Sequence, residues 1–460
     1  MQHGSKAVRN NNVTLAKRGQ LRRRHRGVIP HLAVAAVMSA MLIGFAQSAS
    51  DAASRTNASA AASNYPVTNY ASYVGGTGGK ANQKLAPVDI GWINQQGGSA
   101  DVAPEATTGA EVAVKYMNAE THGIDGHPVR LVTCYIPDTV SSATTCGQGM
   151  ANNKNVIAIG TGAVGVGNQA LETALAPTKK PLVFNFALAP TDARYNPGFV
   201  LFGSSYTTEP PYAELAVDLH VKKVALLYRQ EPGVQIEIDN ILAGLKAAHV
   251  ATTAVVGYDV NASDLTSALE ASRYQGAGLI IWPEGSTAGC SNIYLAVKSL
   301  HVTTPLATAV PCNDPQVAAG DGGSLPNGWY YLSATDVYSP HTAEGAKFLK
   351  VMTQFGEKQL AGDAWDEDSF SQVLTIAKWY YNVLAAKKPL NAANVAAAGR
   401  AYKGPLPFGA PHLACGIYKS SGLPNLCSNE TRIVRYLNGS FHPILGGWVG
   451  EPKGFKPVSS

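Results

Sequence analysis

Charged residues are scarce in this sequence. Asp, Glu, Lys and Arg make up 15% of the 460 residues, whereas hydrophobic residues make up 45%. A disordered chain or a coiled coil needs a larger charged share, so the composition excludes both. Long hydrophobic runs are scarce too: only the stretch 28–46 approaches the length of a membrane span, which excludes a multi-span membrane protein. The length leaves room for two or three compact domains, and abundant Gly and Ala suit α/β domains with short turns.

Acidic residues are absent from the first 50 positions, which hold eight basic residues. The whole-chain charge of +5 therefore hides an asymmetry. The remaining 28 basic and 31 acidic residues give the rest of the chain a formal charge of −3. A mildly acidic body does not attract phosphates, so no nucleic-acid partner is predicted.

The N-terminal residues 1–50 have the order of a secretory signal: a basic flank, the apolar stretch 28–46, and then small residues from Ala46 to Ser50. An uncleaved N-terminal membrane anchor is the competing interpretation, because the apolar stretch is about 19 residues long. No cysteine follows it, which excludes lipid attachment there. Residues 51–83 are rich in Ala, Ser, Asn, Thr and Gly and are predicted to form a flexible spacer.

The chain has only six cysteines, and all lie beyond the leader, in three close pairs along the sequence. In an exported protein this pattern predicts three disulfides. Zinc binding is disfavoured because the sequence has no CxxC spacing. Fifteen pairings are possible. We favour the local pairing, in which each bond closes one loop: Cys134 with Cys146, Cys290 with Cys312, and Cys415 with Cys427.

Apolar runs bounded by turn residues alternate with helical patterns along the body. Continuous apolar strands, rather than alternating ones, are typical of parallel sheets covered on both faces. Eight such runs before residue 311 are enough for two doubly wound sheets. The expected strands are 88–93, 129–135, 155–160, 181–186, 223–228, 251–258, 278–282 and 305–310. The expected helices are 107–120, 168–177, 212–220, 236–249, 265–274, 292–300 and 369–386, followed by a hairpin at 431–444.

Motifs for catalysis are largely missing. The sequence has no P-loop, HExxH, EF-hand loop or nucleophile elbow, so no enzyme activity, cofactor or metal is predicted. GTGAVG at 160–165 matches a dinucleotide fingerprint but follows the third strand and lacks the later acid. A cradle for a carboxylate or polar ligand, built from backbone N–H groups, and a plain tight turn are the other interpretations. The acidic run 366–368 is interpreted as helix N-terminal charge.

Five aromatic residues fall at strand ends or in loops. Each alone is more often a packing residue, but together at the carboxyl ends of parallel strands they indicate a ligand pocket. These residues are Trp92, Tyr206, Tyr228, Trp282 and Trp365.

A series of motifs then appears in a fixed order. The strand VDIGWI leads to a helix opening with Thr108–Glu111 and carrying Asn118, and a Gly123–Gly126 turn, a second strand and Asp138 follow. This series resembles the type I periplasmic binding proteins, in particular their leucine/isoleucine/valine-binding branch. The resemblance extends over residues 85–445 through the segments VIAIGTGAVG, KVALLYRQEPG, FSQVLTIAKWYYNVLAA, YKGPLPFG and YLNGSFHPI.

The resemblance implies an α/β fold of two doubly wound parallel-sheet lobes joined by a three-strand hinge, with a solute bound in the cleft between the lobes. The crossovers are expected near 203–209, 332–338 and 404–414. The first lobe would comprise 84–206 with 336–410, and the second lobe 207–335 with 411–450.

The resemblance also implies a ligand site. Relatives hold an amino-acid carboxylate with backbone N–H groups and a hydroxyl after the glycine turn, and this sequence lacks that hydroxyl. The acid that pairs with the ligand ammonium is replaced near Val310–Pro311, so a less charged, partly apolar ligand is as well supported as an amino acid. Trp365 matches an aromatic lid position. The predicted ligand-binding residues are Gln95, Ala163, Val164, Gly165, Leu188, Thr191, Tyr206, Trp282, Ser286, Asn313, Asp314 and Trp365.

The predicted function is that of an exported, extracytoplasmic receptor that captures a small amino-acid-like or related solute for an ABC transporter permease. Contact with a membrane is expected only through the leader or the transporter. Two alternatives remain: a ligand-sensing ectodomain held by an uncleaved N-terminal helix, and an exported hydrolase.

Overall fold

The computed structural model describes residues 65–98, 103–207, 209–230, 234–313, 315–320, 322–336, 342–356 and 363–458. The predicted secretory signal or anchor at 1–50 and the first part of the predicted spacer lie outside these ranges. Within them, no helix is both long and apolar enough to cross a membrane.

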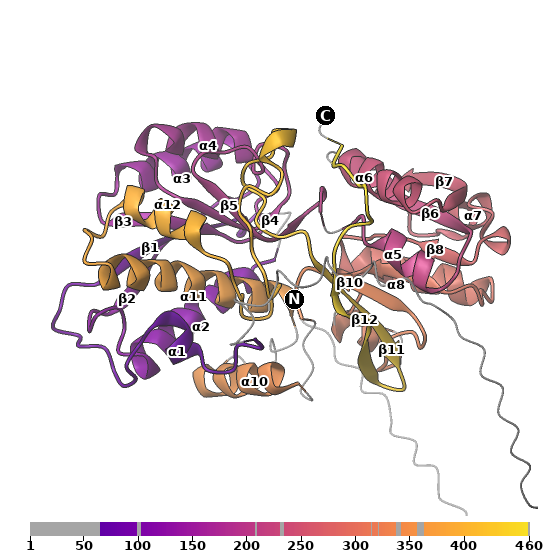
Figure 1. Ribbon diagram of the computed structural model, residues 1–460. Helices are drawn as coiled ribbons and strands as arrows, with labels where there is room; N and C mark the ends of the chain where they lie inside the picture. Colours follow the sequence, from indigo (N-terminus) through magenta and orange to yellow (C-terminus); the bar gives the residue numbers. More distant parts are fainter. Residues whose placement is uncertain are drawn as a thin grey trace, which may run out of the picture. The chain divides into compact units, whose positions relative to one another are not determined.

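The first sheet has five parallel strands in the order β2-β1-β3-β4-β5 (Figure 1). Strand order reverses at β1, so the loops after β1 and β3 leave the sheet in the position where doubly wound folds bind ligands. The strands are β1 (Val88–Asn94), β2 (Val129–Tyr135), β3 (Val156–Thr161), β4 (Leu182–Ala187) and β5 (Gly198–Ser204).

Helices cover both faces of this sheet, which explains why its strands are apolar on both sides. One face packs against α3 (Val140–Asn152) and α4 (Asn168–Leu175). The other packs against α2 (Glu105–Glu120), α11 (Ala364–Ala385) and α12 (Ala392–Ala401), with α1 (Tyr70–Val74) and α10 (Ala343–Phe355) beside them. Figure 1 shows α3 and α4 on the side of the sheet opposite to α2 and α11.

The second sheet has seven strands in the order β12-β11-β10-β9-β8-β6-β7. Pairings from β7 to β10 are parallel, and β11 and β12 add an antiparallel hairpin that turns at Asn438-Gly439, as predicted. The strands are β6 (Lys223–Gln230), β7 (Ala251–Asp259), β8 (Leu279–Ile281), β9 (Leu306–Ala309), β10 (Tyr330–Ser333), β11 (Thr431–Leu437) and β12 (Ser440–Val449).

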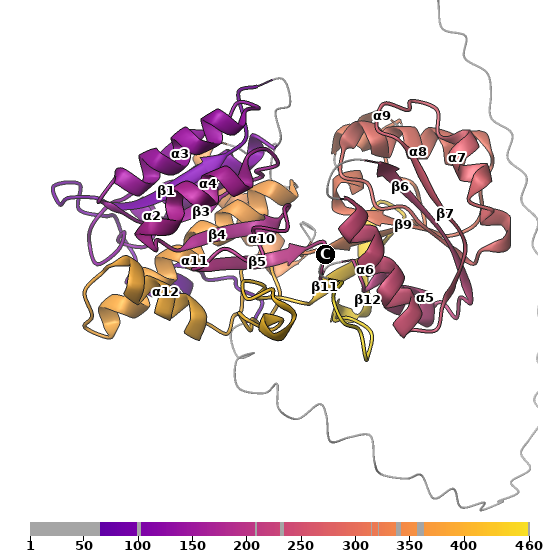
Figure 2. The same ribbon diagram turned by 90° about the horizontal axis from the view of Figure 1, so that it is seen from above.

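This sheet is also covered on both faces (Figure 2). Helices α5 (Tyr212–Asp218) and α6 (Val234–Ala247) pack on one face. Helices α7 (Thr266–Ala271), α8 (Thr287–Ser299) and α9 (Pro315–Gly320) pack on the other. Short 3-10 turns complete the elements: η2 (Ala176–Thr178), η3 (Tyr274–Gly276), η4 (Val310–Asn313) and η6 (Lys419–Ser421). The predicted fold class, two doubly wound parallel-sheet lobes, is confirmed.

Some elements are not visible in the sequence pattern. Helix α3 (VSSATTCGQGMAN) is rich in Ser, Thr and Gly, which favour helices weakly. It forms because Ala143, Cys146 and Met150 pack against the sheet and because the Thr139 hydroxyl accepts from the N–H of Ser142 at 3.1 Å. The strands β5 and β10 are also missed, because a short apolar run between turns does not by itself distinguish a strand from a loop.

Three disulfides join the cysteines in the local pairs that the sequence analysis favours. Cys134–Cys146 ties β2 to α3, and Cys290–Cys312 ties the first turn of α8 to η4. Cys415–Cys427 closes a loop that packs on the first sheet. Each bond therefore restrains a connection between elements of a single lobe.

The predicted spacer is wrong from residue 65 onward. Helix α1 lies in the core of the first lobe, where the fully buried Tyr70 stacks edge-on against Phe370 with ring centroids 5.0 Å apart. Tyr73 donates to or accepts from the Thr375 hydroxyl at 2.9 Å. The composition of the segment predicts a spacer because most of its residues are small or polar. Burial of Tyr70 and Tyr73 fixes it against the first lobe.

The predicted third crossover at 404–414 lies too early in the chain. Residues 411–427, which the prediction assigns to the second lobe, pack on the first sheet, where Val200 of β5 donates its N–H to the carbonyl of Asn425 at 2.9 Å. Leu423 and Leu426 are buried in the core beneath α3 and α4. The chain reaches the second sheet only at Thr431, where β11 begins.

Helices α2 and α11 approach closely at Gly109. A Cβ added there would overlap the carbonyl of Asp366 and lie 2.7 Å from its Cα. We expect Gly109→Ala to lower the free energy of unfolding by about 1–3 kcal/mol, although alanine favours helices more than glycine. Gly149→Ala is the matched control, because Gly149 is helical and no atom lies within 4 Å of its added Cβ. Urea denaturation that ranked the two variants equally would contradict this account.

Candidate functional site

A cavity of about 470 Å³ opens where strands of both sheets end. Gly165 and Leu188 line it from the loops after β3 and β4, and Gly285 and Thr335 line it from those after β8 and β10. Ligands of open parallel sheets bind beyond the carboxyl ends of the strands, so the cavity lies where such folds build their sites. Its size is within the range of small-molecule pockets. We refer to it below as the cleft.

The wall of the cleft combines three kinds of side chain. Large apolar side chains supply most of the contact area, and hydroxyl groups supply neutral hydrogen bonds. Charged side chains form the third kind. The apolar residues are Phe186, Leu188, Val234, Pro283, Val310, Pro311, Leu332 and Trp365. The hydroxyl residues are Ser205, Ser333, Thr335 and Thr431, and the charged residues are Glu209, Arg229, Glu237, Glu284 and Asp368.

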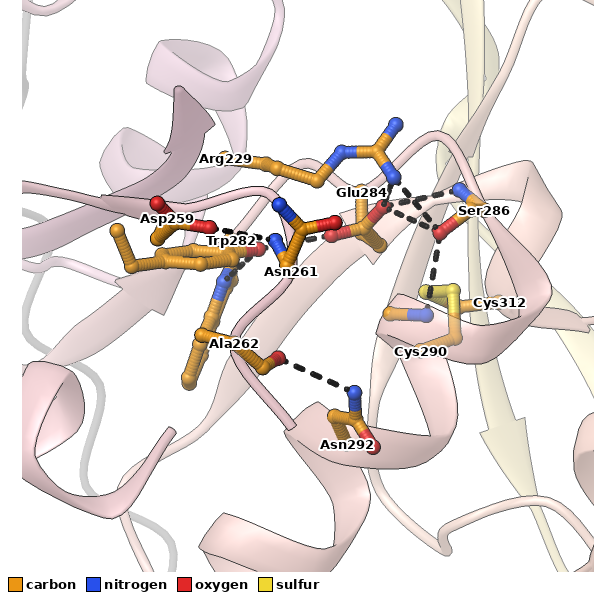
Figure 3. Close-up of polar contacts among 12 residues, drawn as sticks. Arg229, Asp259, Asn261, Ala262, Trp282, Glu284, Ser286, Cys290, Asn292 and Cys312 are labelled. Carbon is orange, nitrogen blue, oxygen red and sulfur yellow. Dashed lines mark hydrogen bonds and ion pairs between the residues drawn. A yellow bond between two sulfur atoms is a disulfide. The ribbon is translucent and has the colours of Figure 1, made fainter. Parts of the chain in front are cut away.

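A hydrogen-bonded network holds Arg229 and Glu284 in the second lobe (Figure 3). The Arg229 guanidinium lies 3.5 Å from Glu284 Oε1 and donates to Ser286 Oγ at 3.1 Å. Ser286 donates its backbone N–H and its hydroxyl to the same Glu284 oxygen at 3.0 and 2.9 Å. Glu284 is thus a buried, multiply bonded acid with fixed orientation.

The other oxygen of Glu284 is bound from behind. The Tyr258 hydroxyl donates to Glu284 Oε2 at 2.8 Å and accepts from Trp282 Nε1 at 3.0 Å. Trp282 is fully buried and packs edge-on against Tyr258. The aromatic residue predicted to contact a ligand therefore supports the acid that lines the cleft.

The glycine turn after β3 is closed by Gln95. The Gln95 side-chain oxygen accepts from the N–H of Gly165 at 2.9 Å and of Val166 at 3.0 Å. Gln95 itself is almost fully buried. Its role is therefore to hold the turn, and Gly165 is the residue of that turn that lines the cleft.

The loop after β4 is closed in a similar way by Asp192. This fully buried carboxylate accepts from the N–H of Ala189 at 2.9 Å and from the Asn168 amide at 3.0 Å. Glu172 lies beside it, and burial together with the neighbouring Asp192 raises the pKa of Glu172 to about 9. At neutral pH the Glu172 carboxyl is therefore protonated, and burial also raises the pKa of the neighbouring Asp192.

The structure places the predicted ligand-binding residues differently relative to the cleft. Gly165, Leu188 and Trp365 line the cleft. Gln95, Ala163, Val164, Tyr206 and Trp282 are buried behind it, and Ser286 and Asn313 stand in its neighbourhood without lining it. Thr191 borders a second hollow of about 740 Å³ over α3 and α4, and Asp314 lies outside the described residues.

The second hollow is the weaker candidate. Its walls come from the first lobe alone, and its described lining includes no charged or aromatic side chain. A site without such groups has little to orient a ligand.

The charged lining of the cleft was missed by sequence reasoning. Asp368 belongs to the acidic run at the start of α11, which the sequence analysis attributes to helix electrostatics, and Glu284 follows a strand by three positions. The strand-end position of Glu284 was a usable signal. Nothing in the sequence indicates that Glu209 and Glu237, which lie on either side of β6 in the chain, line the same cavity.

The start of α11 is a buried acidic cluster behind the cleft. Asp363 caps the helix by accepting from the N–H groups of Trp365 and Asp366 at 2.8 and 3.2 Å. Burial, reinforced by nearby carboxylates, raises the pKa values of Glu367 and Asp368 well above the usual range. Glu344 of α10 accepts from the Phe408 N–H at 2.9 Å, and burial raises its pKa to about 8.

These acids do not form a metal centre. Among the described residues, no three His, Cys, Asp or Glu side chains converge as metal ligands. Asp336 instead pairs with Arg432 at 2.9 Å, which brings β11 of the second sheet against the end of β10.

A sequence model of one family, described as "Periplasmic binding protein", matches residues 87–415. The chain belongs to this family. No curated protein matches the chain. The family has the fold of a solute-binding receptor.

Solved structures of other periplasmic binding proteins share the fold. An ABC transporter substrate-binding protein from Sphaerobacter thermophilus has a TM-score of 0.68 at 16% identity, over 82% of this chain and 100% of that one. A solute-binding protein from R. palustris, in complex with 4-hydroxybenzoate, has a TM-score of 0.63 at 16% sequence identity, over 82% of this chain and 100% of that one. A leucine-binding protein from Thermotoga maritima has a TM-score of 0.59 at 15% sequence identity, over 79% of this chain and 99% of that one.

The raised pKa of Glu344 predicts a pH-dependent stability. Between its ordinary value near 4.5 and its folded value near 8, the unfolded chain loses this proton and the folded protein keeps it. The contribution of the protonated Glu344 to the free energy of unfolding is therefore fully present below about pH 4.5 and is lost as the pH rises to 8. The free energy of unfolding of Glu344→Gln, which has no carboxyl to titrate, should not show this loss. We expect the difference between the variant and the wild type to rise in favour of the variant by about 1–3 kcal/mol from pH 5 to pH 8.

Urea denaturation of both proteins at several pH values measures this difference. Glu270→Gln, at an exposed position on α7, is the control for changing a carboxyl to an amide. If the difference in free energy of unfolding between Glu344→Gln and the wild type does not change with pH, the raised pKa of Glu344 would be contradicted.

Proposed function

We propose that this protein is an extracytoplasmic receptor that captures a small solute in the cleft and delivers it to an ABC-type importer. The observation that carries the proposal is the cavity of about 470 Å³ lined from the strand ends of both lobes, in a chain of the periplasmic binding protein family. Its partners would be the solute and a transporter permease. The export that this role requires rests on the predicted leader at 1–50.

The lining of the cleft supports solute binding. Trp365 is the second residue of α11, where its backbone N–H donates to the Asp363 carboxylate at 2.8 Å, and its indole adds apolar surface to the cleft. Phe186 and Leu332 add further apolar surface, and the hydroxyls of Ser205 and Thr335 offer neutral hydrogen bonds. An apolar pocket with a few polar groups is typical of sites that bind one small molecule.

A hydrolase is less well supported. The described lining of the cleft includes serine and threonine hydroxyls but neither histidine nor cysteine. A hydroxyl nucleophile needs a base oriented against it. The anchored ectodomain differs from the released receptor only in the leader, and N-terminal sequencing of the exported protein distinguishes them, because a start near Asp51 means release.

Thermal unfolding with a broad panel of metabolites tests the proposal. A solute that binds the folded protein raises the melting temperature in a concentration-dependent manner. Any compound found by this panel, or by mass spectrometry of the purified protein, then serves as the ligand for affinity measurements. A panel in which no compound stabilises the protein would count against the receptor function.

Trp365→Ala is expected to weaken binding of that compound by about tenfold or more, because buried aromatic contacts commonly contribute 1–2 kcal/mol or more. Tyr135→Ala is the matched control, since Tyr135 is 39% exposed on β2 and does not line the cleft. Calorimetric titration of both variants measures the effect. Equal affinities for the two variants would remove Trp365 from the site.

A further inference from the structure

Two loops of the second lobe contribute to the wall of the cleft, and the pairing of their strands ends before either loop begins. Residues 283–285 follow β8, and residues 309–311 run from the end of β9 into η4. The last register pair between the two strands joins Ile281 to Ala307. The spacing of the two loops is therefore set by whatever connects them beyond this ladder.

A disulfide connects the far ends of the two loops (Figure 3). Cys290 lies in the first turn of α8, which begins shortly after the first loop, and Cys312 lies in η4 next to Pro311 of the second loop. Both cysteines are buried. A covalent bond therefore ties the start of α8 to the turn that carries Val310 and Pro311 into the cleft.

Hydrogen bonds extend this restraint from Cys290 to Glu284. Ser286 caps α8 by accepting from the Gly289 N–H at 3.1 Å, and it donates its hydroxyl to Glu284 Oε1 at 2.9 Å. Gly289 lies so close to this acid that an added Cβ would be 2.2 Å from the Glu284 carboxyl carbon. Glu284, which lines the cleft, is therefore held against the helical turn that the disulfide fixes.

The near ends of the two loops are joined as well. Trp282 and Thr308 directly precede the loops, and the Thr308 hydroxyl donates to the Trp282 carbonyl at 2.8 Å. The same hydroxyl oxygen lies 3.1 Å from Cys312 Sγ. The loops are thus clamped at both ends, by a hydrogen bond where the strands stop and by the disulfide where α8 and η4 begin to separate them.

The other two disulfides have no such place. Cys134–Cys146 joins β2 to α3, and Cys415–Cys427 closes a loop on the first sheet. Neither β2, α3 nor that loop contributes to the described lining of the cleft. All three bonds restrict the unfolded chain, but the bond in the second lobe also lies where it can set the geometry of the lining.

We propose that the Cys290–Cys312 bond is a positioning element of the solute site, which holds Glu284 and Val310 at a fixed spacing before any solute arrives. A wall that is already ordered spares the binding step the entropy of ordering two loops, and this difference strengthens affinity. The inference rests on the proposed receptor function, and it assigns to one disulfide a part in binding as well as in stability.

Hydrogen exchange measured by mass spectrometry tests the positioning without any solute. Replacing both Cys290 and Cys312 by alanine removes the bond and leaves no free thiol, and the same double replacement of Cys134 and Cys146 is the matched control. We expect the peptides that cover the two loops to exchange about tenfold faster or more in the first variant, and as in the wild type in the control. Wild-type exchange of these peptides in the first variant, or acceleration spread evenly over the strands of both sheets, would overturn the proposal.

Calorimetric titration tests the consequence for binding, with the panel compound that most raises the melting temperature of the wild-type protein. We expect this compound to bind about tenfold more weakly to the Cys290 and Cys312 variant, and with wild-type affinity to the control. Equal affinities of the two variants, despite faster exchange in the loops, would overturn the part of the bond in binding and leave the receptor function standing. A panel without any stabilising compound would overturn the receptor function, and this part with it.

A pair of helix-cap variants tests the same restraint with every disulfide intact, and decides the question even where a double alanine variant does not fold. Ser286→Ala removes the cap of α8 and the hydroxyl bond to Glu284, whereas Thr139→Ala removes the cap of α3, whose hydroxyl accepts from the Ser142 N–H at the same 3.1 Å. Loss of either cap lowers helix stability by a similar amount. We expect only Ser286→Ala to speed exchange in the loop after β8 and to weaken binding of the panel compound, by about threefold. If this loop exchanges alike in both cap variants, the path from Cys290 to Glu284 is wrong.

Discussion

The packing of α11 on the first sheet is the constraint on which the cleft depends. Gln372 of this helix donates its side-chain amide to the carbonyls of Thr161 and Val183 at 3.2 and 2.9 Å, which fixes the helix to the last residue of β3 and the second residue of β4. Ser369 bonds Asn185 of β4 at 2.8 Å. These buried bonds set the position of Trp365 and Asp368, one turn earlier, against the loops that carry Gly165 and Leu188. The lobe is thus completed by a helix that the chain reaches only after building most of the second lobe.

Buried acid is the second theme of the structure. Glu344 of α10 and Glu367 and Asp368 of α11 are buried, and burial raises the pKa of each. Burying carboxyl groups lowers stability unless they stay protonated or find cations, so a structure that gathers several of them sacrifices stability for some other property. Of these three acids, Asp368 lines the cleft.

The candidate site was only partly visible in the sequence. Gly165, Leu188 and Trp365 line the cleft, and the family resemblance assigns them to the site through the glycine turn, the segment after the next strand and the aromatic position before the late helix. Gln95 was found too, but as a ligand contact, whereas it bonds a turn 70 residues away. Trp282 was chosen for its aromatic ring at a strand end, and the structure buries that ring behind Glu284. Whether a strand-end side chain faces the cleft or the core depends on its neighbours in space, which local patterns do not report.

The sequence by itself determined the α/β architecture, the parallel sheets and the local cysteine pairs, because these follow from apolar runs, turn residues and short loops. The tertiary structure alone decided that residues 65–83 belong to the core and that 411–427 stay with the first lobe, since buried contacts to distant strands and helices hold both segments. It also decided which acidic residues line the cleft. Glu209, Glu237, Glu284 and Asp368 are far apart along the chain, and only the meeting of strand ends from both sheets brings them around one cavity.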